Sequence, residues 1–434
     1  MVTVGNICPN SGRTSWRRPP SPTLAGMSER STILVSVNGP DHPGISAGLM
    51  DVLSAGGAEI YDIEQIVVRG RLTLNILVGV AAEQATIRDL LFFGWEAGLH
   101  IEFEVVDTTP SSPKSLSIVT VLGVRVGPED FGAVATAIAS GRGNIERIFR
   151  LSRYPIMSYE LTISGGDIDE IRAGLVEAAS ERPIDVAIQV EGLERRARRM
   201  VVLDVDSTLI QEEIINLLAR EAGVEGKVSA ITAAAMTGEI DFEGSLRERV
   251  SLLEGLDEPA LDRVSEAIAV TPGARTFIRT VKRLGMKTAI VSAGFTRFAD
   301  TLATELGVDY SLSNTLEIED GVLTGGLTGK LVDGPRKAEF LRSIADAEGI
   351  ALSQVVAVGD GANDLDMLAV AGLGIAFNAK PILKEGADTS VSVPFLDAIL
   401  FLMGIRRELV EAADAADPDF EQTPLIEVPG TPPV

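Results

Sequence analysis

Residues 200–210 read MVVLDVDSTLI, and this stretch decides the fold. Its continuous apolar, β-branched run predicts a buried strand of a parallel sheet. The run ends at Asp204 and Asp206, which are separated by one residue and so point the same way at a strand end. Two carboxylates this close repel each other unless one is protonated or a cation lies between them. The stretch therefore predicts either a plain acidic turn or a site for a divalent cation, of which Mg²⁺ suits a site shared with a phosphate.

Two further apolar runs end in polar residues in the same way. Residues 290–295, IVSAGF, break at Ser292, and residues 355–361, VVAVGDG, end at Asp360. Loops at the carboxyl ends of the strands of an open parallel sheet share one crevice, so groups distant in sequence meet there. The pattern predicts an α/β domain with a doubly wound, Rossmann-like parallel sheet over residues 199–411.

The crevice is expected to hold a metal ion and a phosphate. We expect Asp204, Asp206 and Asp360 to ligate one Mg²⁺. Lys337, in a turn that enters a helix, would present a positive charge to the phosphate. The hydroxyl of Ser292 and the free N–H groups of Ser292, Ala293 and Gly294 are expected to contact the phosphate. Asn363 and Asp364 are expected to support the metal ligands, and Asn363 also to face the substrate.

The order of these motifs, Asp-x-Asp-x-Thr, Ser, Lys and Gly-Asp-Gly-x-Asn-Asp, resembles the haloacid dehalogenase-like phosphatase superfamily across residues 199–405. The resemblance implies that Asp204 attacks phosphorus and forms an aspartyl-phosphate. It implies that Asp206 protonates the leaving alkoxide and later takes a proton from the hydrolytic water. Lys337 would then stabilise the charge on the phosphoryl oxygens.

A helical cap is predicted between the first two motifs, at about residues 212–270, where it could shut water out of the crevice. The expected helices are Glu212–Glu221, Glu225–Met236, Phe242–Leu253 and Glu258–Ala269. Two charged residues of the cap, Glu213 and Arg249, suit an α-amino acid, because a carboxylate pairs with an ammonium and a guanidinium binds a carboxylate. Solvated helix faces would show the same charges.

Five segments in and around the cap resemble the phosphoserine phosphatase family: 204–213 (DVDSTLIQEE), 236–238 (MTG), 241–242 (DF), 245–250 (SLRERV) and 291–295 (VSAGF). The resemblance implies hydrolysis of O-phospho-L-serine to L-serine and phosphate, the last step of serine biosynthesis. By position, Glu213 would contact the substrate ammonium and Arg249 its carboxylate. Met236 and Phe242 would form the apolar wall of the cap.

The first part of the chain contains an internal repeat. Residues 28–108 and 114–192 each show the order βαββαβ, which predicts a four-stranded antiparallel sheet with both helices on one face. In each copy a Gly-Pro-x-x-x-Gly turn follows the first strand, at Gly39–Gly44 and Gly127–Gly132. A turn that enters a helix can place backbone N–H groups around a small anion such as a carboxylate.

Both copies resemble the ACT domain, a small amino-acid-sensing fold. The resemblance implies a ligand loop in the first copy, formed by Asn38, Gly39, Asp41, His42 and Gly44. The second copy departs from it, with Arg125 in place of Asn38 and Asp130-Phe131 in place of the His-Pro pair. We expect L-serine to bind the first loop and to bias subunit arrangement or cap closure. The paired modules also suggest a homodimer, and pairing with another subunit would be a sufficient role for them.

Composition limits the other partners. The chain has 38 Lys and Arg against 62 Asp and Glu, a formal charge of −24, which argues against nucleic acid or an anionic membrane. The single Cys8 and two histidines exclude a Cys- or His-rich metal cluster. Without a membrane-length apolar run or a secretory signal pattern, we expect a cytoplasmic protein. Residues 1–27 and 412–434 are expected to be disordered.

Two rival functions use the same residues. A phosphotransferase would pass the phosphoryl group to another hydroxyl amino acid, such as homoserine. An amino-acid-sensing regulator would carry the phosphatase scaffold without using it. The complete set Asp204, Asp206, Lys337 and Asp360 argues against the regulator, because a buried acidic cluster without a chemical role only costs stability.

Overall fold

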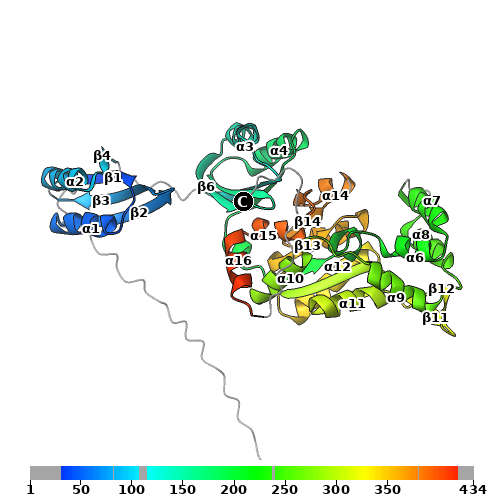
Figure 1. Ribbon diagram of the computed structural model, residues 1–434. Helices are drawn as coiled ribbons and strands as arrows, with labels where there is room; N and C mark the ends of the chain where they lie inside the picture. Colours follow the sequence, from blue (N-terminus) through cyan, green and yellow to red (C-terminus); the bar gives the residue numbers. More distant parts are fainter. Residues whose placement is uncertain (1–30, 82, 107–114, 237–239, 380, 419–434) are drawn as a thin grey trace, which may run out of the picture. The chain divides into compact units, whose positions relative to one another are not determined.

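The computed structural model describes residues 31–81, 83–106, 115–236, 240–379 and 381–418 (Figure 1). The chain divides into two compact units, Met1–Ser112 and Pro113–Val434. Each unit is described by itself below. Among the described residues no helix is both long enough and apolar enough to cross a membrane.

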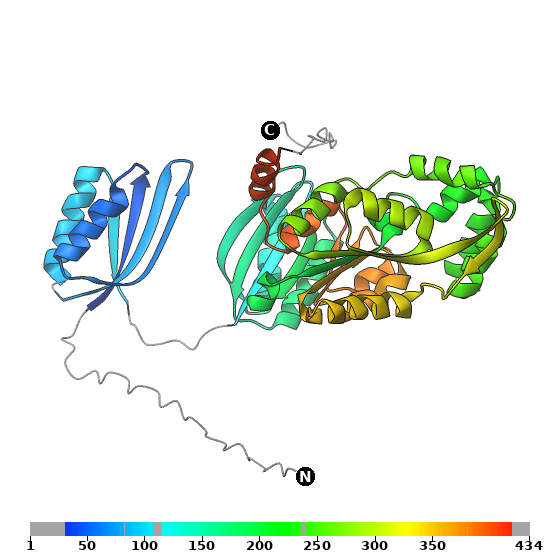
Figure 2. The ribbon, with the colours of Figure 1, turned by 90° about the horizontal axis from the view of Figure 1, so that it is seen from below.

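The first unit has the predicted βαββαβ order: β1 Ser31–Pro40, α1 Ile45–Ala55, β2 Glu59–Val68, β3 Arg71–Val80, α2 Glu83–Ala97 and β4 His100–Val105. Its antiparallel sheet has the order β2-β3-β1-β4, and both helices cover one face (Figure 2). Alternate residues of the central strands, such as Val35 and Leu74, are buried on that face with Leu49 of α1. The predicted antiparallel sheet is confirmed.

The second copy begins the second unit: β5 Leu116–Gly123, α3 Pro128–Ser140, β6 Asn144–Ser152, β7 Met157–Ser164, α4 Ile168–Ser180 and β8 Asp185–Val190. The sheet order β6-β7-β5-β8 repeats that of the first copy. One face packs on its two helices, with Val119 and Leu175 in the core. The other face contributes Leu122 and Ala187 to a larger core that it shares with the following domain.

The remaining elements are α5 Leu193–Arg196, β9 Met200–Leu203, a wide turn Val205–Leu209, α6 Ile214–Glu221, α7 Glu225–Met236, α8 Phe242–Ser251, α9 Glu258–Ala267, α10 Ala274–Arg283, β10 Lys287–Phe295, α11 Thr296–Leu306, β11 Tyr310–Glu319, β12 Val322–Thr328, α12 Gly334–Ala347, β13 Val355–Gly359, α13 Leu365–Val370, β14 Leu373–Phe377, α14 Pro381–Gly386, β15 Thr389–Val391, α15 Ile399–Leu402 and α16 Arg407–Ala415, with short 3-10 turns at Leu352–Gln354, Ala362–Asp364 and Leu396–Ala398.

These elements form a seven-stranded sheet in the order β12-β11-β10-β9-β13-β14-β15. All neighbours are parallel except the edge pair β11–β12. The central strand β9 is buried on both faces, because Val201 and Leu203 pack in the core that includes Phe277 of α10, whereas Val202 packs in the core that includes Leu341 of α12. The predicted doubly wound α/β sheet is confirmed, and four helices, α6 to α9, occupy the predicted cap.

The β11–β12 hairpin was not among the predicted elements. Its strands join at Asp320 and Gly321, whose φ angles of 48° and 79° suit a tight hairpin turn. The hairpin is hydrogen-bonded to the cap. The Leu323 carbonyl accepts from the Gly255 N–H, and the Leu323 N–H donates to the Leu256 carbonyl; both partners follow α8. The Asp-Gly pair was the available sequence signal for this turn.

The ordered chain also continues beyond its expected end at Glu411. Helix α16 runs to Ala415, and its Asp414 is buried. The Asp414 carboxylate accepts hydrogen bonds from Arg279 Nε at 2.9 Å and Nη2 at 2.8 Å, and from Arg283. The expectation of disorder is therefore wrong for residues 412–418, because the acidic segment pairs with two arginines of α10. Residues 1–27 and 419–434 lie outside the described residues.

Candidate active site

The predicted site residues lie where β9, β10 and β13 end and α12 begins. Asp204 directly follows β9, and its N–H donates to the Val358 carbonyl of β13 at 2.8 Å. Lys337 of α12 donates to the Asp204 carboxylate. Ser292 of β10 donates to Asp206 Oδ2 at 2.8 Å. Groups that are far apart in the sequence are thus in direct contact, as expected from the sheet topology.

A buried lysine binds two of the acids. Lys337 Nζ donates to Asp204 Oδ1 and, at 2.7 Å, to Asp364 Oδ1. Burial alone would lower the pKa of Lys337, but the two carboxylates outweigh it and raise the pKa above its usual value. Burial and the neighbouring Asp364 raise the pKa of Asp204 well above its usual value, although Lys337 opposes them. The cluster carries more acids than one lysine neutralises, which favours a bound cation.

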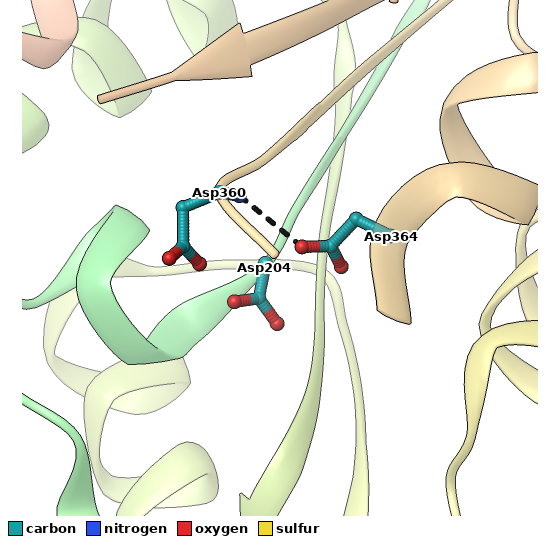
Figure 3. A group of neighbouring side chains, drawn as sticks. All are labelled: Asp204, Asp360 and Asp364. Atoms are coloured by element: carbon teal, nitrogen blue, oxygen red, sulfur yellow. Dashed lines mark hydrogen bonds between the residues drawn. The ribbon is translucent and has the colours of Figure 1, made fainter. Parts of the chain in front are cut away.

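Three carboxylates form a group that can hold a metal ion. Asp204, Asp360 and Asp364 each offer an oxygen, and these oxygens lie within 4.8 Å of one another (Figure 3). The Asp360 N–H donates to Asp364 Oδ2 at 3.2 Å, and the Gly361 N–H donates to the same oxygen at 3.1 Å. These two bonds hold the Asp364 carboxylate beside the other two. An all-oxygen donor set suits a hard divalent cation such as Mg²⁺.

The carboxylate of Asp206 was expected beside those of Asp204 and Asp360, but it binds other groups. Its Oδ1 accepts a hydrogen bond from the Ile214 N–H at 2.7 Å and its Oδ2 from Ser292 at 2.8 Å. The strand ends at Leu203, and Ser207 has a φ of 59°, so the rule that alternate residues share a side no longer applies. Geometry therefore favours Asp364 over the Asp206 carboxylate as the third acid of the group.

The surroundings of Asp206 suit a proton donor. Burial raises its pKa above the usual value, although the hydrogen bonds from Ile214 and Ser292 oppose the shift. A carboxyl group whose pKa is raised holds its proton at a higher pH, as a general acid must. Its position next to the first residue of α6 also places it at the junction between the sheet and the cap.

The segment Ser292-Ala293-Gly294 lies against Asp206. Ser292 is fully buried, and its hydroxyl accepts a hydrogen bond from the Gly294 N–H at 2.7 Å. A Cβ atom on Gly294 would lie 2.8 Å from both Asp206 Oδ2 and Ser292 Oγ, so only glycine permits this approach. One further polar residue reaches the segment: Asn314 of β11 donates to the Ala293 carbonyl at 2.7 Å. No sequence motif pointed to Asn314, because it lies inside a strand.

The two charged residues of the cap face each other near the acids. Arg249 Nη1 lies 3.9 Å from Glu213 Oε2, and Glu213 immediately precedes α6. Burial lowers the pKa of Arg249, while the charges of Glu213 and Asp206 oppose this. Glu213 directly precedes Ile214, whose N–H donates to Asp206 Oδ1, so the pair lies close to this acid. The geometry can therefore bring an ammonium and a carboxylate of one ligand next to Asp206.

For three further residues that were predicted to contact the substrate, the structure gives less detail. Phe242 is half-buried at the start of α8 and packs against the main core. Asn363 is partly exposed in the turn Ala362–Asp364, directly before the buried Asp364. The side chain of Met236 lies outside the described residues.

The predicted ligand loop belongs to the first unit. Asn38 and Gly39 lie at the end of β1, and Gly39 is buried. Asp41, His42 and Gly44 are exposed between β1 and α1. Gly44 has a φ of 100°, a left-handed conformation that favours glycine, and precedes the first residue of α1. The five residues therefore form a strand–turn–helix junction with an accessible turn.

Comparison with known families agrees with this geometry. Residues 201–369 match the haloacid dehalogenase-like hydrolases, and residues 31–104 and 115–189 each match the ACT domain. The fold and the site thus define a haloacid dehalogenase-like hydrolase with two ACT domains.

Relatives narrow the class. The chain is 48% identical to a phosphoserine phosphatase of Streptomyces coelicolor, over 92% of this chain and 98% of the relative. It is 46% identical to the phosphoserine phosphatase SerB2 of Mycobacterium tuberculosis, over 90% of this chain and 97% of the relative. The chain belongs to the phosphoserine phosphatase family.

Two solved structures are also similar. One is a haloacid dehalogenase family hydrolase of Salmonella enterica serovar Typhi, with a TM-score of 0.59 and 30% identity, covering 66% of this chain and 98% of that one. The other is a probable phosphoserine phosphatase of Vibrio cholerae, with a TM-score of 0.53 and 34% identity, covering 68% of this chain and 88% of that one.

Proposed function

We propose that this chain hydrolyses O-phospho-L-serine to L-serine and phosphate, the last step of serine biosynthesis. The observation that carries the proposal is the pair Glu213 and Arg249, 3.9 Å apart, because Glu213 directly precedes Ile214, whose N–H binds Asp206. The buried acid–lysine cluster supplies phosphoryl chemistry, and the pair supplies recognition of an amino acid. The family to which the chain belongs supports both parts.

Asp204 is the proposed nucleophile. Attack of its carboxylate on phosphorus would form an aspartyl-phosphate and release the serine alkoxide. Lys337, which already binds the Asp204 carboxylate, would remain close to the charge on the phosphoryl oxygens. The segment Ser292-Ala293-Gly294, which lies against Asp206, is the proposed neighbour of the same oxygens when the substrate is bound.

Asp206 is the proposed general acid and base. Its raised pKa suits donation of a proton to the serine oxygen as the bond to phosphorus breaks. The resulting carboxylate would then take a proton from the water that attacks the aspartyl-phosphate. The hydrogen bonds from Ile214 and Ser292 hold the carboxyl group in place for both steps.

Magnesium is the proposed metal, held by Asp204, Asp360 and Asp364. The support is the donor set: three carboxylates with oxygens within 4.8 Å, one of which has a strongly raised pKa. When bound, Mg²⁺ would neutralise these acids and polarise the phosphate. Asp206, expected as the third ligand, contributes its carboxyl group to proton transfer instead.

Regulation and assembly belong to the same proposal. L-serine is the proposed ligand of the turn around Asp41 and His42, since an enzyme that makes serine could be regulated by its product. A homodimer is supported by β2, an edge strand whose apolar residues Ile63, Ile66 and Val68 are 49%, 49% and 62% exposed. A cytoplasmic location, expected from the sequence, stays part of the proposal.

The test is phosphate release with Mg²⁺ from O-phospho-L-serine and from O-phosphoethanolamine, which lacks the carboxylate. The expected kcat/KM is at least about 100-fold higher for phosphoserine, because the unmatched Arg249 remains buried with the poorer substrate. Equal values would contradict the assignment of Glu213 and Arg249. Added L-homoserine tests the rival phosphotransferase, which would form O-phosphohomoserine in place of free phosphate.

A further inference from the structure

Strand β10 contains an irregularity beside the catalytic acids. In its parallel ladder with β11, Val291 pairs with Leu312, but the next pair is Phe295 with Asn314. Residues 292–294 therefore stand opposite Ser313 alone. Such a bulge removes backbone groups from the ladder and re-aims the segment, and bulges of this kind are common next to active sites.

The side chain of Asn314 forms hydrogen bonds with two backbone groups near the bulge. Asn314 is 2% exposed. Its Nδ2 donates to the Ala293 carbonyl at 2.7 Å, and its Oδ1 accepts from the Val332 N–H at 2.9 Å. A carbonyl can only accept and an N–H can only donate, so these two partners define which end of the amide is nitrogen. One side chain thereby joins the bulge to the segment that leads into α12 and Lys337.

The hydrogen bond to Ala293 has a consequence for Asp206. In a planar trans peptide the C=O and the following N–H point in opposite directions. Because Asn314 holds the Ala293 C=O, the Gly294 N–H points to the other side, where it donates to Ser292 Oγ at 2.7 Å. Ser292 in turn donates to Asp206 Oδ2 at 2.8 Å. The orientation of the Asn314 amide thus reaches Asp206 through one peptide and one hydroxyl group.

We propose that Asn314 is a positioning residue for proton transfer: by fixing the Ala293–Gly294 peptide it aligns Ser292 and, through it, the carboxyl group of Asp206. The inference deepens the proposed phosphatase function and rests on it. The side chain of Asn314 binds the backbone of Ala293 and Val332, so it acts on the reaction through these groups.

The variant Asn314→Asp tests this role at nearly constant shape. It keeps an acceptor for Val332 but replaces the donor to Ala293 with an oxygen, which disfavours the observed peptide orientation. On O-phospho-L-serine kcat is expected to fall by about 10²-fold, as for a displaced catalytic group. KM is expected to change by less than about threefold, because Glu213 and Arg249 lie on the cap.

A second substrate separates positioning from a general loss of structure. The p-nitrophenolate leaving group needs little protonation, whereas the serine alkoxide needs a well-placed acid. The loss of kcat on p-nitrophenyl phosphate is therefore expected to be at least about tenfold smaller than on phosphoserine. If wild type does not hydrolyse phosphoserine, the proposed function fails, and the same comparison is made with O-phosphoethanolamine as the alkyl ester.

Thr288→Val is the matched control. Thr288 is 1% exposed and its Oγ1 donates to Asp309 Oδ2 at 2.9 Å, so it joins β10 to the residue just before β11, at the end away from the site. The control is expected to lower the melting temperature but to leave kcat within about twofold of wild type. Asn314→Ala, which removes both bonds without adding a charge, serves if Asn314→Asp does not fold. Equal losses on the two substrates, or an equal loss of kcat in the control, would overturn the proposal.

Discussion

The two ACT domains share one topology but use their helix-free sheet faces differently. In the second domain part of this face is buried, and Leu122 and Ala187 belong to one core with Leu400 of α15. In the first domain Leu34 and Leu77 stand opposite each other on the corresponding face and remain partly exposed. The same small fold therefore serves once as a structural part of the catalytic unit and once as a separate module.

Polar contacts reinforce the attachment of the second domain. Gln189 Nε2 donates to the Leu402 carbonyl at 2.9 Å, and the Ser392 N–H donates to Asp185 Oδ2 at 2.6 Å. Arg195, which precedes β9, donates to Glu160 Oε2 at 2.6 Å and is buried. Removing the second domain would leave these partners without their bonds and expose the apolar face.

The largest difference between the two domains is expected when each is removed by truncation. A chain that starts at residue 193 is expected to lose its soluble, active form, because the core around Leu400 and the Arg195 guanidinium lose their cover. A chain that starts at residue 113 is expected to keep kcat within about twofold, because the proposed catalytic residues all lie in the second unit. It should no longer respond to L-serine.

These truncations are compared by phosphate release and by heat inactivation, with the full chain as reference. An inactive chain from residue 113 would contradict the view that the first domain is a separate module. A chain from residue 193 that is as stable as the full chain would contradict the structural role of the second domain. A serine response that survives without the first unit would move the regulatory site to the second domain.

Single substitutions give a smaller version of the same contrast. Leu122→Ala empties a fully buried position in the core that the second domain shares with the following domain, and is expected to cost about 2–5 kcal/mol. Leu77→Ala, on the partly exposed face of the first domain, is expected to cost less than about 1 kcal/mol. Thermal unfolding followed by circular dichroism, which reports on both units, is the measurement. Equal shifts for the two variants would mean that the two faces are used alike.

The smallest expected effect is at the C-terminal helix. Burial opposes ionisation of Asp414, but hydrogen bonds from Arg279 and Arg283 lower its pKa below the usual value. Asp414→Asn is expected to cost about 1–2 kcal/mol at pH 7, because the ionised carboxylate gains these bonds only in the folded protein. The wild type loses this stabilisation as the pH falls below the usual value of 3.8, since the lowered folded pKa lies there.

Urea unfolding of wild type and Asp414→Asn, at pH 7 and near pH 3, checks both parts. The difference in stability should narrow at the lower pH. Glu411→Gln is the control on the same helix, because its bond to Arg407 is exposed. A pH-independent difference would show that packing of α16, rather than the charge of Asp414, is responsible.

Sequence patterns predicted most of the fold because the strands are either alternating or continuously apolar. The βαββαβ order of both ACT domains is as expected, and the bounds of α7, Glu225–Met236, agree with the expected ones. The β11–β12 hairpin was harder to find, since Asn314 interrupts the apolar pattern of β11 for a reason that lies in tertiary structure. Helix α16 escaped prediction because an acidic, alanine-rich segment looks solvated unless its arginine partners on α10 are known.

The site was predictable as a set of residues but less so as a set of roles. The motif order identified Asp204, Lys337 and Asp360, whose convergence follows from parallel topology alone. That Asp364, and not Asp206, lies with Asp204 and Asp360 in the three-carboxylate group depends on the left-handed Ser207 and on the turn at Gly361. Side-chain direction after a strand end is a property of the turn, and periodicity carries no information about it.

The most direct test of the account is phosphate release from O-phospho-L-serine with Mg²⁺, by wild type and by Asp204→Asn. The substitution keeps the shape of the side chain and removes the nucleophilic carboxylate. The account predicts rapid release by wild type and a loss of at least about 10⁴-fold in kcat for the variant, as for removal of a covalent nucleophile. Similar rates for the two proteins would contradict the assignment of Asp204 and with it the proposed mechanism.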